Sequence, residues 1–511
     1  MASPSLAVSA ATYRNRYYAW AFYDWANSAV VTLVIAAVFP VFFNQVIAKD
    51  TPDAASLFAY IGAAALLLSI IAAPVIGTLG DITGQRKRLL IATTTGGSLA
   101  VCALFTTQMG TIAWAALLFI LIQISLNMSF TLYDSLLSHV AREDDRDRLS
   151  TTGYALGYIG GGLHLLVCVI LGLASSELAT RAALLSAGVW WFVFALPLFI
   201  AVPEPPASHI KGESVDPFSA TFKRLKDTLQ HISRYRQLLL MLAAFWLYSD
   251  GIGTIIGLST TYGSQQLRLN STTLVGALLL TQFVAFPYAL MFGRIASPSS
   301  RYRDLFVAFI LWTVITFPIM GFFIARNEFG GVMEQLATLG SGEYLSYSPV
   351  QTLTLVAINQ VVGLLLCWFI GRRLVTGIAA ALTTKRAILL GIGVYIVIAV
   401  WAFLINTPGE FWLLAWLVAT VQGGTQALSR SLFSTMTPAS KSGEFFGFYS
   451  LTDKFGSIFG LLLFGLIGQI TQNLRISILS VIVFFVAGGL MLMRVDEKKG
   501  HLAAVADEVA S

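Results

Sequence analysis

The chain is poor in charged residues. Only 11% of its 511 residues are Asp, Glu, Lys or Arg, whereas 56% are hydrophobic and the mean hydropathy is +0.76. Soluble domains carry about 25% charged residues, so this composition excludes a soluble protein and predicts a polytopic membrane protein. The net charge of +6 then reflects where lysine and arginine flank the membrane, and it does not indicate nucleic-acid binding.

Cysteine and catalytic motifs are also scarce. Cys102, Cys168 and Cys367 all fall in apolar segments, which excludes a disulfide framework, and they form no CxxC pair. The sequence has no Walker loop, which argues against ATP-driven transport by this chain alone. No His and Cys cluster has metal-ligand spacing, and no Ser, His and Asp set stands out. We therefore expect no enzymatic activity, no cofactor and no metal.

Apolar segments long enough to cross a bilayer recur along the chain, since about 20 such residues span the hydrocarbon core. Six of them precede a polar segment at 203–236 and eight follow it. This pattern predicts an all-α bundle of about fourteen transmembrane helices. The predicted spans are 17–46, 57–79, 88–107, 111–139, 152–174, 180–202, 237–262, 272–294, 304–325, 350–371, 387–406, 411–434, 445–470 and 474–494.

Lysine and arginine support this count. If the amino terminus is inside, the predicted inner segments hold 26 basic residues and the outer ones five, while Lys454 lies within a span. The positive-inside rule produces such a bias, and one missed or invented span would reverse it downstream. Both termini are therefore predicted to be cytoplasmic, and we expect a bacterial plasma membrane.

The same pattern divides the chain into four parts. Residues 1–203 form a six-helix half, 204–236 a cytoplasmic linker, 237–494 a second half, and 495–511 a short tail that we expect to be frayed. The linker predicts an amphipathic helix along the membrane surface, and it acts either as a connector or as a regulatory element. Its apolar stripe comprises Phe218, Phe222, Leu225, Leu229 and Ile232, and the basic residues off that stripe are Lys223, Arg224 and Lys226.

The first span carries polar groups on one helical face. Asp24, Asn27 and Ser28 share that face, and Thr32 lies one turn beyond. A carboxylate in a membrane helix costs about 2.5–3.5 kcal/mol on insertion scales, so it normally faces a partner or a water-filled cavity. Two interpretations follow: the carboxylate ties two helices together, or it lines a pathway for a solute or a proton.

The chain also contains a weak internal repeat. Phe22-Tyr23-Asp24 in the first span resembles Leu247-Tyr248-Ser249-Asp250 in the seventh, and Tyr133-Asp134-Ser135-Leu136 resembles Ser429-Arg430-Ser431-Leu432. Homologous halves are typical of secondary transporters, whose sites lie between the repeats. Asp134 and Arg430 occupy equivalent positions with opposite charge. Either they approach each other and help to close an inner gate, or they are independent interfacial charges.

Polar stripes continue on three more spans. They begin at Gln123 in the fourth span, at Asp250 in the seventh and at Gln422 in the twelfth. Each stripe alone could join helices, but together they favour a water-filled pathway. The candidate pathway residues for a substrate or a coupling ion are Asp24, Asn27, Ser28, Gln123, Asn127, Asp134, Asp250, Gln422, Gln426 and Arg430.

A glycine-rich loop joins the second and third spans, with the sequence GTLGDITGQRKRL from Gly77 to Leu89. It resembles the G-x-L-x-D-x-x-G-[RK] loop of the major facilitator superfamily, with Ile82 and Gln85 where basic residues are usual. The resemblance implies that the loop docks on a helix of the other half in one alternating-access state. We expect Arg86 to anchor the loop at the lipid headgroups. The candidate loop residues are Gly77, Gly80, Asp81, Gly84 and Arg86.

Four further motifs refine the resemblance: Tyr23–Ser28, Gly157–Gly161, Gln422–Leu432 and Glu444–Gly447. They are similar to the vacuolar-effluxer-like branch of the superfamily, which includes autophagy-related fungal proteins. This branch implies a secondary transporter, with amino-acid efflux from the fungal vacuole. It also implies twelve spans, so the chain has an extra helix pair near 296–372.

The sequence therefore predicts a secondary active transporter that moves a small solute, such as an amino acid, by alternating access. We expect coupling to an ion, with Asp24 or Asp250 carrying a proton. The alternative from another class is a membrane-embedded interaction or lipid-handling protein on a carrier scaffold, because a fold alone does not fix function.

Overall fold

The structure is a computed structural model that describes residues 9–173, 175–208, 216–297, 300–325 and 349–510. Twelve described helices are long and apolar enough to cross a membrane. The prediction of an all-α, multi-pass membrane protein is therefore confirmed. Helices α18 (Pro408–Thr435) and α19 (Ser442–Thr471) coincide with two more predicted spans but are not among the twelve, so the count of fourteen stays a prediction.

The chain forms two compact units. Unit 1 comprises Met1–Ala243, Arg430–Lys454 and Arg494–Ser511, and unit 2 comprises Ala244–Ser429 and Phe455–Met493. These units follow packing and do not coincide with the predicted halves of the sequence. The end of α18 and the beginning of α19 group with the first six spans.

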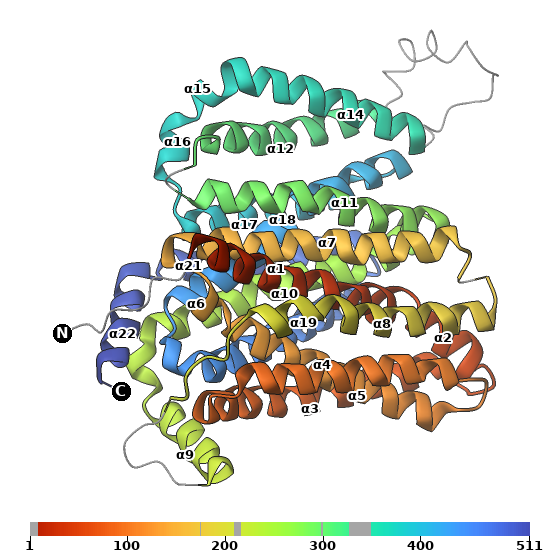
Figure 1. The fold of residues 1–511 in the computed structure, drawn as a ribbon. Helices are drawn as coiled ribbons and strands as arrows, with labels where there is room; N and C mark the ends of the chain where they lie inside the picture. The colour runs from red at the N-terminus through yellow and green to blue at the C-terminus, as the bar shows by residue number, and fades with distance from the viewer. Residues whose placement is uncertain (1–8, 174, 209–215, 298–299, 326–348, 511) are drawn as a thin grey trace. The chain divides into compact units, whose positions relative to one another are not determined.

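Unit 1 is built around the first helix. Helix α1 packs against α7 and α8, while α5 packs against α3 and α4, and Figure 1 shows α3, α4 and α5 side by side. Helix α1 (Ala10–Val30) is continued to Ile47 by two π-helical turns and the short helix α2 (Phe39–Phe42). The other elements of unit 1 are α3 (Ala54–Thr83), α4 (Arg86–Ala103), α5 (Ile112–Ser135), α6 (Leu137–Val140), α7 (Arg146–Ile170), α8 (Glu177–Ala201), α9 (Pro217–Gln230), the beginning of α10 (Arg236–Gln266), the end of α18, the beginning of α19, and α22 (Glu497–Ala510).

Unit 2 contains the predicted extra pair, which corresponds to α12 and α14. Helix α12 packs on α11, and α14 packs on α12. Figure 1 shows α12 and α14 side by side in green and teal. The elements of this unit are most of α10 (Arg236–Gln266), α11 (Ser271–Ala296), α12 (Arg303–Ala325), α14 (Pro349–Leu366), α15 (Arg372–Leu374), α16 (Thr376–Ala381), α17 (Thr384–Leu404), most of α18, the rest of α19, α20 (Leu474–Ser480) and α21 (Ile482–Met493).

Local sequence explains where several helices begin and end. Ser176 accepts a hydrogen bond from the Ala179 amide at 3.2 Å, so it caps the start of α8. Asn270 caps α11 in the same way through the amide of Thr273 at 2.8 Å. Helix α3 ends at Gly84, whose φ of +62° is the left-handed conformation that glycine adopts without strain.

The linker forms the predicted helix, α9, but its charged face is partly buried. Phe218 and Phe222 are each 61% exposed, whereas Arg224 is 3% exposed. The buried positions Ala220, Arg224 and Thr228 recur at a spacing of four residues, which is one face of a helix. Helix α9 therefore places a largely polar face against the protein and leaves its phenylalanines outward.

The tail is ordered, which corrects the expectation that it is frayed. Residues Glu497–Ala510 form α22. The Lys441 ammonium lies 2.7 Å from the Asp507 carboxylate, and the Ser440 amide donates to Glu508 at 2.6 Å. These contacts hold α22 against the short loop before α19, so tertiary pairing supplies the order that an isolated helix of this length lacks.

Candidate functional site

Three charged side chains from distant parts of the sequence meet inside unit 1. The Arg430 guanidinium of α18 lies 2.9 Å from the Asp134 carboxylate of α5 and 3.2 Å from the Asp24 carboxylate of α1. The side chains of Asp24 and Arg430 are almost fully buried. We call these three residues the ion cluster. The approach of Asp134 to Arg430 is observed as proposed from the repeat, while the contact with Asp24 was not anticipated.

Neutral groups complete the hydrogen bonding of the ion cluster. The Nε atom of Arg430 donates to the Ser150 hydroxyl and an Nη atom to the Ser150 carbonyl, both at 2.9 Å. The Tyr133 hydroxyl donates to Asp24 at 3.0 Å. Buried charges are tolerated when they are paired and hydrogen-bonded in this way. The cluster is therefore compensated rather than strained.

Aromatic rings surround the guanidinium of Arg430. Its central carbon lies 4.9 Å from the ring centre of Trp20, 5.5 Å from that of Tyr133 and 4.5 Å from that of Tyr154. Trp20 and Tyr133 also stack on each other at 4.3 Å. Ring faces attract cations, especially away from water. The aromatic residues around span one thus belong to the same site as the charges.

The polar stripe of α1 faces a glycine stripe on α7. A Cβ atom on Gly153 would lie 2.5 Å from an Asp24 carboxylate oxygen, and one on Gly157 would lie 2.7 Å from the Ser28 hydroxyl. Glycine at these positions lets the two helices approach closely. In this conformation Ser28 therefore contributes to helix packing, and its part in a pathway stays a prediction.

The remaining predicted residues of unit 1 lie near this stripe or on α5. The Nδ2 atoms of Asn27 and Asn127 are buried and have no hydrogen-bond partner among the residues that the structure describes. Gln123 is partly exposed on α5, one turn before Asn127. Buried amide donors without partners are uncommon and favour a site that exchanges water or ligand.

Unit 2 holds the other three predicted pathway residues, Asp250, Gln422 and Gln426. Asp250 lies on α10 and is 1% exposed, and the structure shows no hydrogen-bond partner for either carboxylate oxygen. Gln422 and Gln426 lie one turn apart on α18 and are partly exposed. Asp250 therefore differs from Asp24 in having no compensating charge among the described side chains.

The glycine-rich loop contacts the beginning of α19, as the resemblance implied for such a loop. The Asp81 carboxylate accepts hydrogen bonds from the backbone amides of Gly443 and Glu444, both at 2.9 Å. These amides are free donors of the first turn of α19, where a negative charge is favoured. Gly77 lies against the Gly443 backbone with no space for a Cβ atom.

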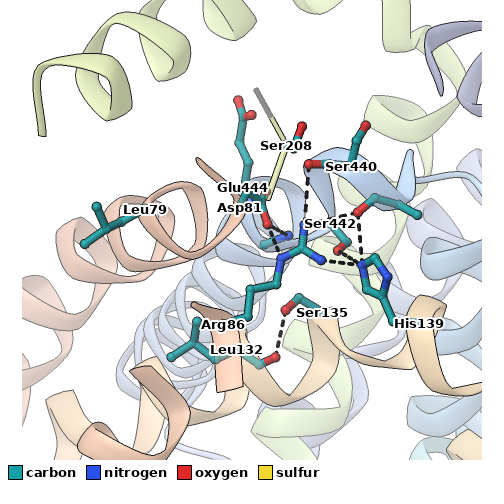
Figure 2. Close-up of polar contacts among 12 residues, drawn as sticks. Leu79, Asp81, Arg86, Leu132, Ser135, His139, Ser208, Ser440, Ser442 and Glu444 are labelled. Atoms are coloured by element: carbon teal, nitrogen blue, oxygen red, sulfur yellow. Dashed lines mark hydrogen bonds and ion pairs between the residues drawn. The ribbon is translucent and has the colours of Figure 1, made fainter. Parts of the chain in front are cut away.

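Arg86 is not at the lipid headgroups, so that expectation was wrong. Its side chain is fully buried, and its Nε atom lies 2.5 Å from Asp81. Figure 2 shows the guanidinium between the Asp81 carboxylate and the His139 ring. An Nη atom of Arg86 also donates to the Ala439 carbonyl at 3.2 Å. A carboxylate buried under a helix terminus needs a counter-ion, and Arg86 is the nearest basic residue in sequence.

Sequence reasoning missed three residues of this region, His139, Arg224 and Glu444. The Nε atom of Arg224 on α9 lies 3.2 Å from a Glu444 carboxylate oxygen, and its guanidinium also reaches the carbonyls of Ser208 and Ser440. Burial raises the pKa of the Glu444 carboxyl to about 7, and the Arg224 guanidinium opposes that rise. We call Asp81, Arg86, His139, Arg224 and Glu444 the loop cluster. Glu444 stood in a family motif, but nothing in the sequence linked it to Arg224.

The other two loop glycines have identifiable packing roles. A Cβ atom on Gly80 would lie 3.0 Å from the Cγ atom of Arg86, and one on Gly84 would lie 2.7 Å from the backbone nitrogen of Ala207. Both contacts are tighter than most side chains allow. The loop glycines thus permit the linker and Arg86 to pack against α3.

The comparisons with known proteins decide the family. A family model described as "Vacuole effluxer Atg22 like" matches residues 12–339 and 319–505. The chain belongs to this family. Its relatives are transporters and not enzymes, so this Atg22-like chain is a membrane transporter.

Two curated relatives illustrate the range of the family. The Atg22-like chain is 29% identical over 494 residues to the uncharacterized MFS-type transporter YxiO of Bacillus subtilis (strain 168), with 94% of each chain covered. It is 24% identical over 381 residues to autophagy-related protein 22 of Yarrowia lipolytica (strain CLIB 122 / E 150), covering 70% of this chain. The match spans about half of that fungal relative, 51% of its length.

Solved structures of major facilitator transporters share the fold. The TM-score is 0.59 against the transporter FucP, with 10% identity and coverage of 95% of this chain and 99% of that one. It is 0.53 against the proton:xylose symporter XylE, with 14% identity and coverage of 98% and 99%. At such identities the likeness shows the fold alone.

Other polar groups of the Atg22-like chain hold helices together. The Trp312 indole of α12 donates to Asn359 of α14 at 2.6 Å, and the Tyr288 hydroxyl of α11 donates to Gln360 at 2.8 Å. Among the described residues, no group of three or more His, Cys, Asp or Glu side chains could hold a metal ion. A pocket of about 390 Å³ contains none of the predicted pathway residues, being lined by Arg294, Tyr302, Leu305, Phe306 and Trp368.

Proposed function

We propose that this chain is a secondary active transporter that moves a small solute by alternating access and is coupled to an ion. It would have fourteen spans, with both termini in the cytoplasm of a bacterium. The observation that carries the proposal is the ion cluster. It joins α1 and α5, which precede the linker, to α18, which follows it.

A buried ion cluster suits a contact that must break and re-form. Paired charges inside a protein contribute little net stability compared with apolar packing, because desolvation offsets their attraction. Yet charged residues in membrane segments normally mark pathways of ions or substrates. We therefore assign the contacts among Asp24, Asp134 and Arg430 to one closed state. In that state the three charges pair with one another, in place of the water or solute that would bind them in another state.

The loop cluster supports the same state. Asp81 binds two free amides at the start of α19, and Arg86 neutralises Asp81. Both interactions depend on close approach of the backbone at Gly77 and Gly443. When the state changes, these contacts would separate together, and water would satisfy the amides and the carboxylate.

The chemistry of the ion cluster favours amino acids as the solute class. Arg430 offers a cation for an α-carboxylate, as it does for Asp24 and Asp134. The two aspartates offer anions for an α-ammonium group, and Trp20 and Tyr154 offer apolar ring surface. An amino-acid zwitterion could replace the ion pairs within the cluster without leaving any charge unpaired.

Reconstitution tests the proposal. Purified protein in liposomes would receive a mixture of isotope-labelled amino acids outside and an imposed pH gradient, and mass spectrometry would measure uptake. We expect uptake above protein-free liposomes, and we expect Arg430→Gln to abolish it. The control variant is Arg301→Gln, because Arg301 is exposed and lies outside both clusters.

The same vesicles distinguish the alternative. If the protein moves no amino acid but accelerates scrambling of a fluorescent lipid, the lipid-handling interpretation replaces the transporter. If it moves some amino acids at equal rates with and without the gradient, ion coupling is wrong although carriage of the solute stands.

A further inference from the structure

Asp250 is a buried carboxylate with no partner among the described side chains. It lies on α10 in unit 2, and within the described part of the chain no side chain or cation pairs with either oxygen, while the backbone nitrogen of Gly460 lies near one of them. One turn along, the hydroxyl of Thr254 is also buried without a partner. Two adjacent unsatisfied polar side chains are uncommon in a native interior and call for an unseen ligand.

The space beside Asp250 is very small. Gly460 of α19 faces this pair, and a Cβ atom there would lie 3.2 Å from an Asp250 oxygen and would overlap the Thr254 hydroxyl. The α19 backbone at Gly460 therefore leaves no room for an organic solute between itself and this pair. Hard metal cations take about six oxygen ligands, whereas this site offers one carboxylate and one hydroxyl from described side chains. A proton is the ligand that fits.

The described charged residues of the surrounding helices do not compensate Asp250. On α10, Arg236 lies 14 residues earlier in the sequence, roughly 20 Å along a helix. On α18, Glu410 accepts bonds from Asn406 and Thr407, and Arg430 is engaged in the ion cluster. Helix α21 carries no charged residue. On α19, the side chains of Asp453 and Lys454 lie outside the described residues, so both enter the experiment as variants.

An ionised carboxylate with no partner is costly in an apolar interior, and binding a proton removes that cost. Asp24 is different, because it pairs with the Arg430 guanidinium and accepts a hydrogen bond from the Tyr133 hydroxyl. We propose that Asp250 is the proton-binding group of this transporter and that Thr254 accepts the hydrogen bond of the protonated carboxyl. Its part in coupling rests on the proposed function, while proton binding itself does not.

Thermal unfolding tests proton binding without any solute. The Tm of purified protein would be measured from pH 4 to 8.5 for the wild type, Asp250→Asn, Asp24→Asn, Asp453→Asn and Lys454→Gln. Only the folded protein carries the cost of an unpaired Asp250 charge, so wild-type Tm should fall as pH rises above about 4, where an unfolded aspartate ionises, and level off once the folded carboxyl is also ionised. We expect Asp250→Asn to match the wild type near pH 4 and to melt about 2 °C or more above it at pH 8.5.

Several outcomes would overturn the assignment. Parallel curves for the wild type and Asp250→Asn would show that Asp250 does not titrate. Loss of the pH slope in Lys454→Gln alone would show that a lysine, not a proton, meets Asp250. If the wild-type Tm is higher in sodium chloride than in choline chloride, and Asp250→Asn abolishes that difference, the ligand is sodium. Asp250→Ser repeats the test if Asp250→Asn does not fold.

A flux split connects the site to coupling. In liposomes, Asp250→Asn should retain amino-acid exchange between equal pools and lose accumulation driven by a pH gradient. Retained accumulation would remove Asp250 from coupling, whatever the Tm shows. Failure of all flux in the wild type would instead count against the proposed function and leave the proton site to the Tm result.

Discussion

Two segments with the same sequence pattern carry their carboxylates in different surroundings. In unit 1, the Tyr23 hydroxyl bonds to that of Thr94 at 2.6 Å, and in unit 2 the Tyr248 hydroxyl bonds to that of Ser429 at 2.6 Å. In both, a hydroxyl one turn after the aspartate faces a glycine of a later helix. The scaffolds are alike, but Asp24 meets Arg430, and Asp250 meets no cation among the described residues.

The difference teaches that the motif places a carboxylate while a distant residue decides its chemistry. Arg430 lies more than 400 residues after Asp24 in the sequence. With Arg430 as its partner, the Asp24 carboxylate forms an ion pair that can hold helices together. Without such a partner, the charge is costly and favours a proton. The following predictions test this contrast, from the largest expected effect to the smallest.

Arg430→Gln should destabilise the protein most, because it leaves Asp24 and Asp134 buried without a counter-ion. Removing one partner of a buried ion pair typically costs about 3–5 kcal/mol. We expect a large loss of Tm at pH 8, whereas Asp250→Asn should raise Tm at the same pH. Opposite signs would sustain the contrast between the two carboxylates, and a loss of similar size in both would contradict it.

Exchanging the charges of Asp134 and Arg430 should restore only part of the stability. Asp134→Arg alone places two guanidinium groups together, and adding Arg430→Asp restores that pair. However, an aspartate at position 430 then faces Asp24, so rescue should be complete only when Asp24→Asn is added. Tm and amino-acid uptake of the single, double and triple variants measure this. Full rescue in the double variant would mean that the Asp24 contact is unimportant.

Alanine at Gly153 should separate α1 from α7 and stretch the bond between Asp24 and Arg430. Overpacking of this kind costs about 1–3 kcal/mol. Gly460→Ala should have a similar cost in unit 2, because its Cβ would overlap Thr254. Gly257→Ala is the matched control, since a Cβ there would meet nothing within 4 Å. Equal Tm for all three variants would refute close packing at the two carboxylates.

Arg224→Gln should have the smallest effect, and the effect should depend on pH. Burial raises the pKa of Glu444 from 4.5 to about 7. The folded state therefore holds the proton longer than the unfolded state, and stability falls as pH rises between these values. We expect Arg224→Gln to cost about 1–2 kcal/mol at pH 8.5, where Glu444 is ionised, and little at pH 5.5. Paired Tm measurements in a Glu444→Gln background, where the cost of Arg224→Gln should no longer depend on pH, provide the check.

Hydropathy and loop charges predicted the helices because lipid constrains every backbone group in the same way. The repeat gave the approach of Asp134 and Arg430 as one of two alternatives, and the structure shows that approach. The repeat missed the bond to Asp24, because periodicity gives the direction of a side chain around its helix but not which helix lies there. Arg86 was placed at the headgroups because three consecutive basic residues usually lie there. The structure instead pairs Arg86 with the Asp81 carboxylate, and of the three only Lys87 and Arg88 lack that contact.

Contacts that form only after folding explain the other misses. Arg224 was assigned to the surface of an amphipathic helix, but the structure buries it in an ion pair with Glu444. The tail is rich in alanine, glutamate and lysine, which favour a helix, but an isolated helix of 14 residues is marginal. Its order therefore depends on Lys441, which lies 66 residues before Asp507. Pairs this far apart have no signature in a single sequence.

The order of α22 has a practical consequence for experiments on this protein. Helix α22 holds the 439–441 loop, and the carbonyls of that loop accept bonds from Arg86 and Arg224. A fluorescent protein or affinity tag fused after residue 511 would therefore act through α22 on the 439–441 loop, which directly precedes the α19 amides that bind Asp81. Tags are better placed before residue 9, and a removable carboxyl-terminal fusion would serve as a handle for testing how strain on the tail alters transport.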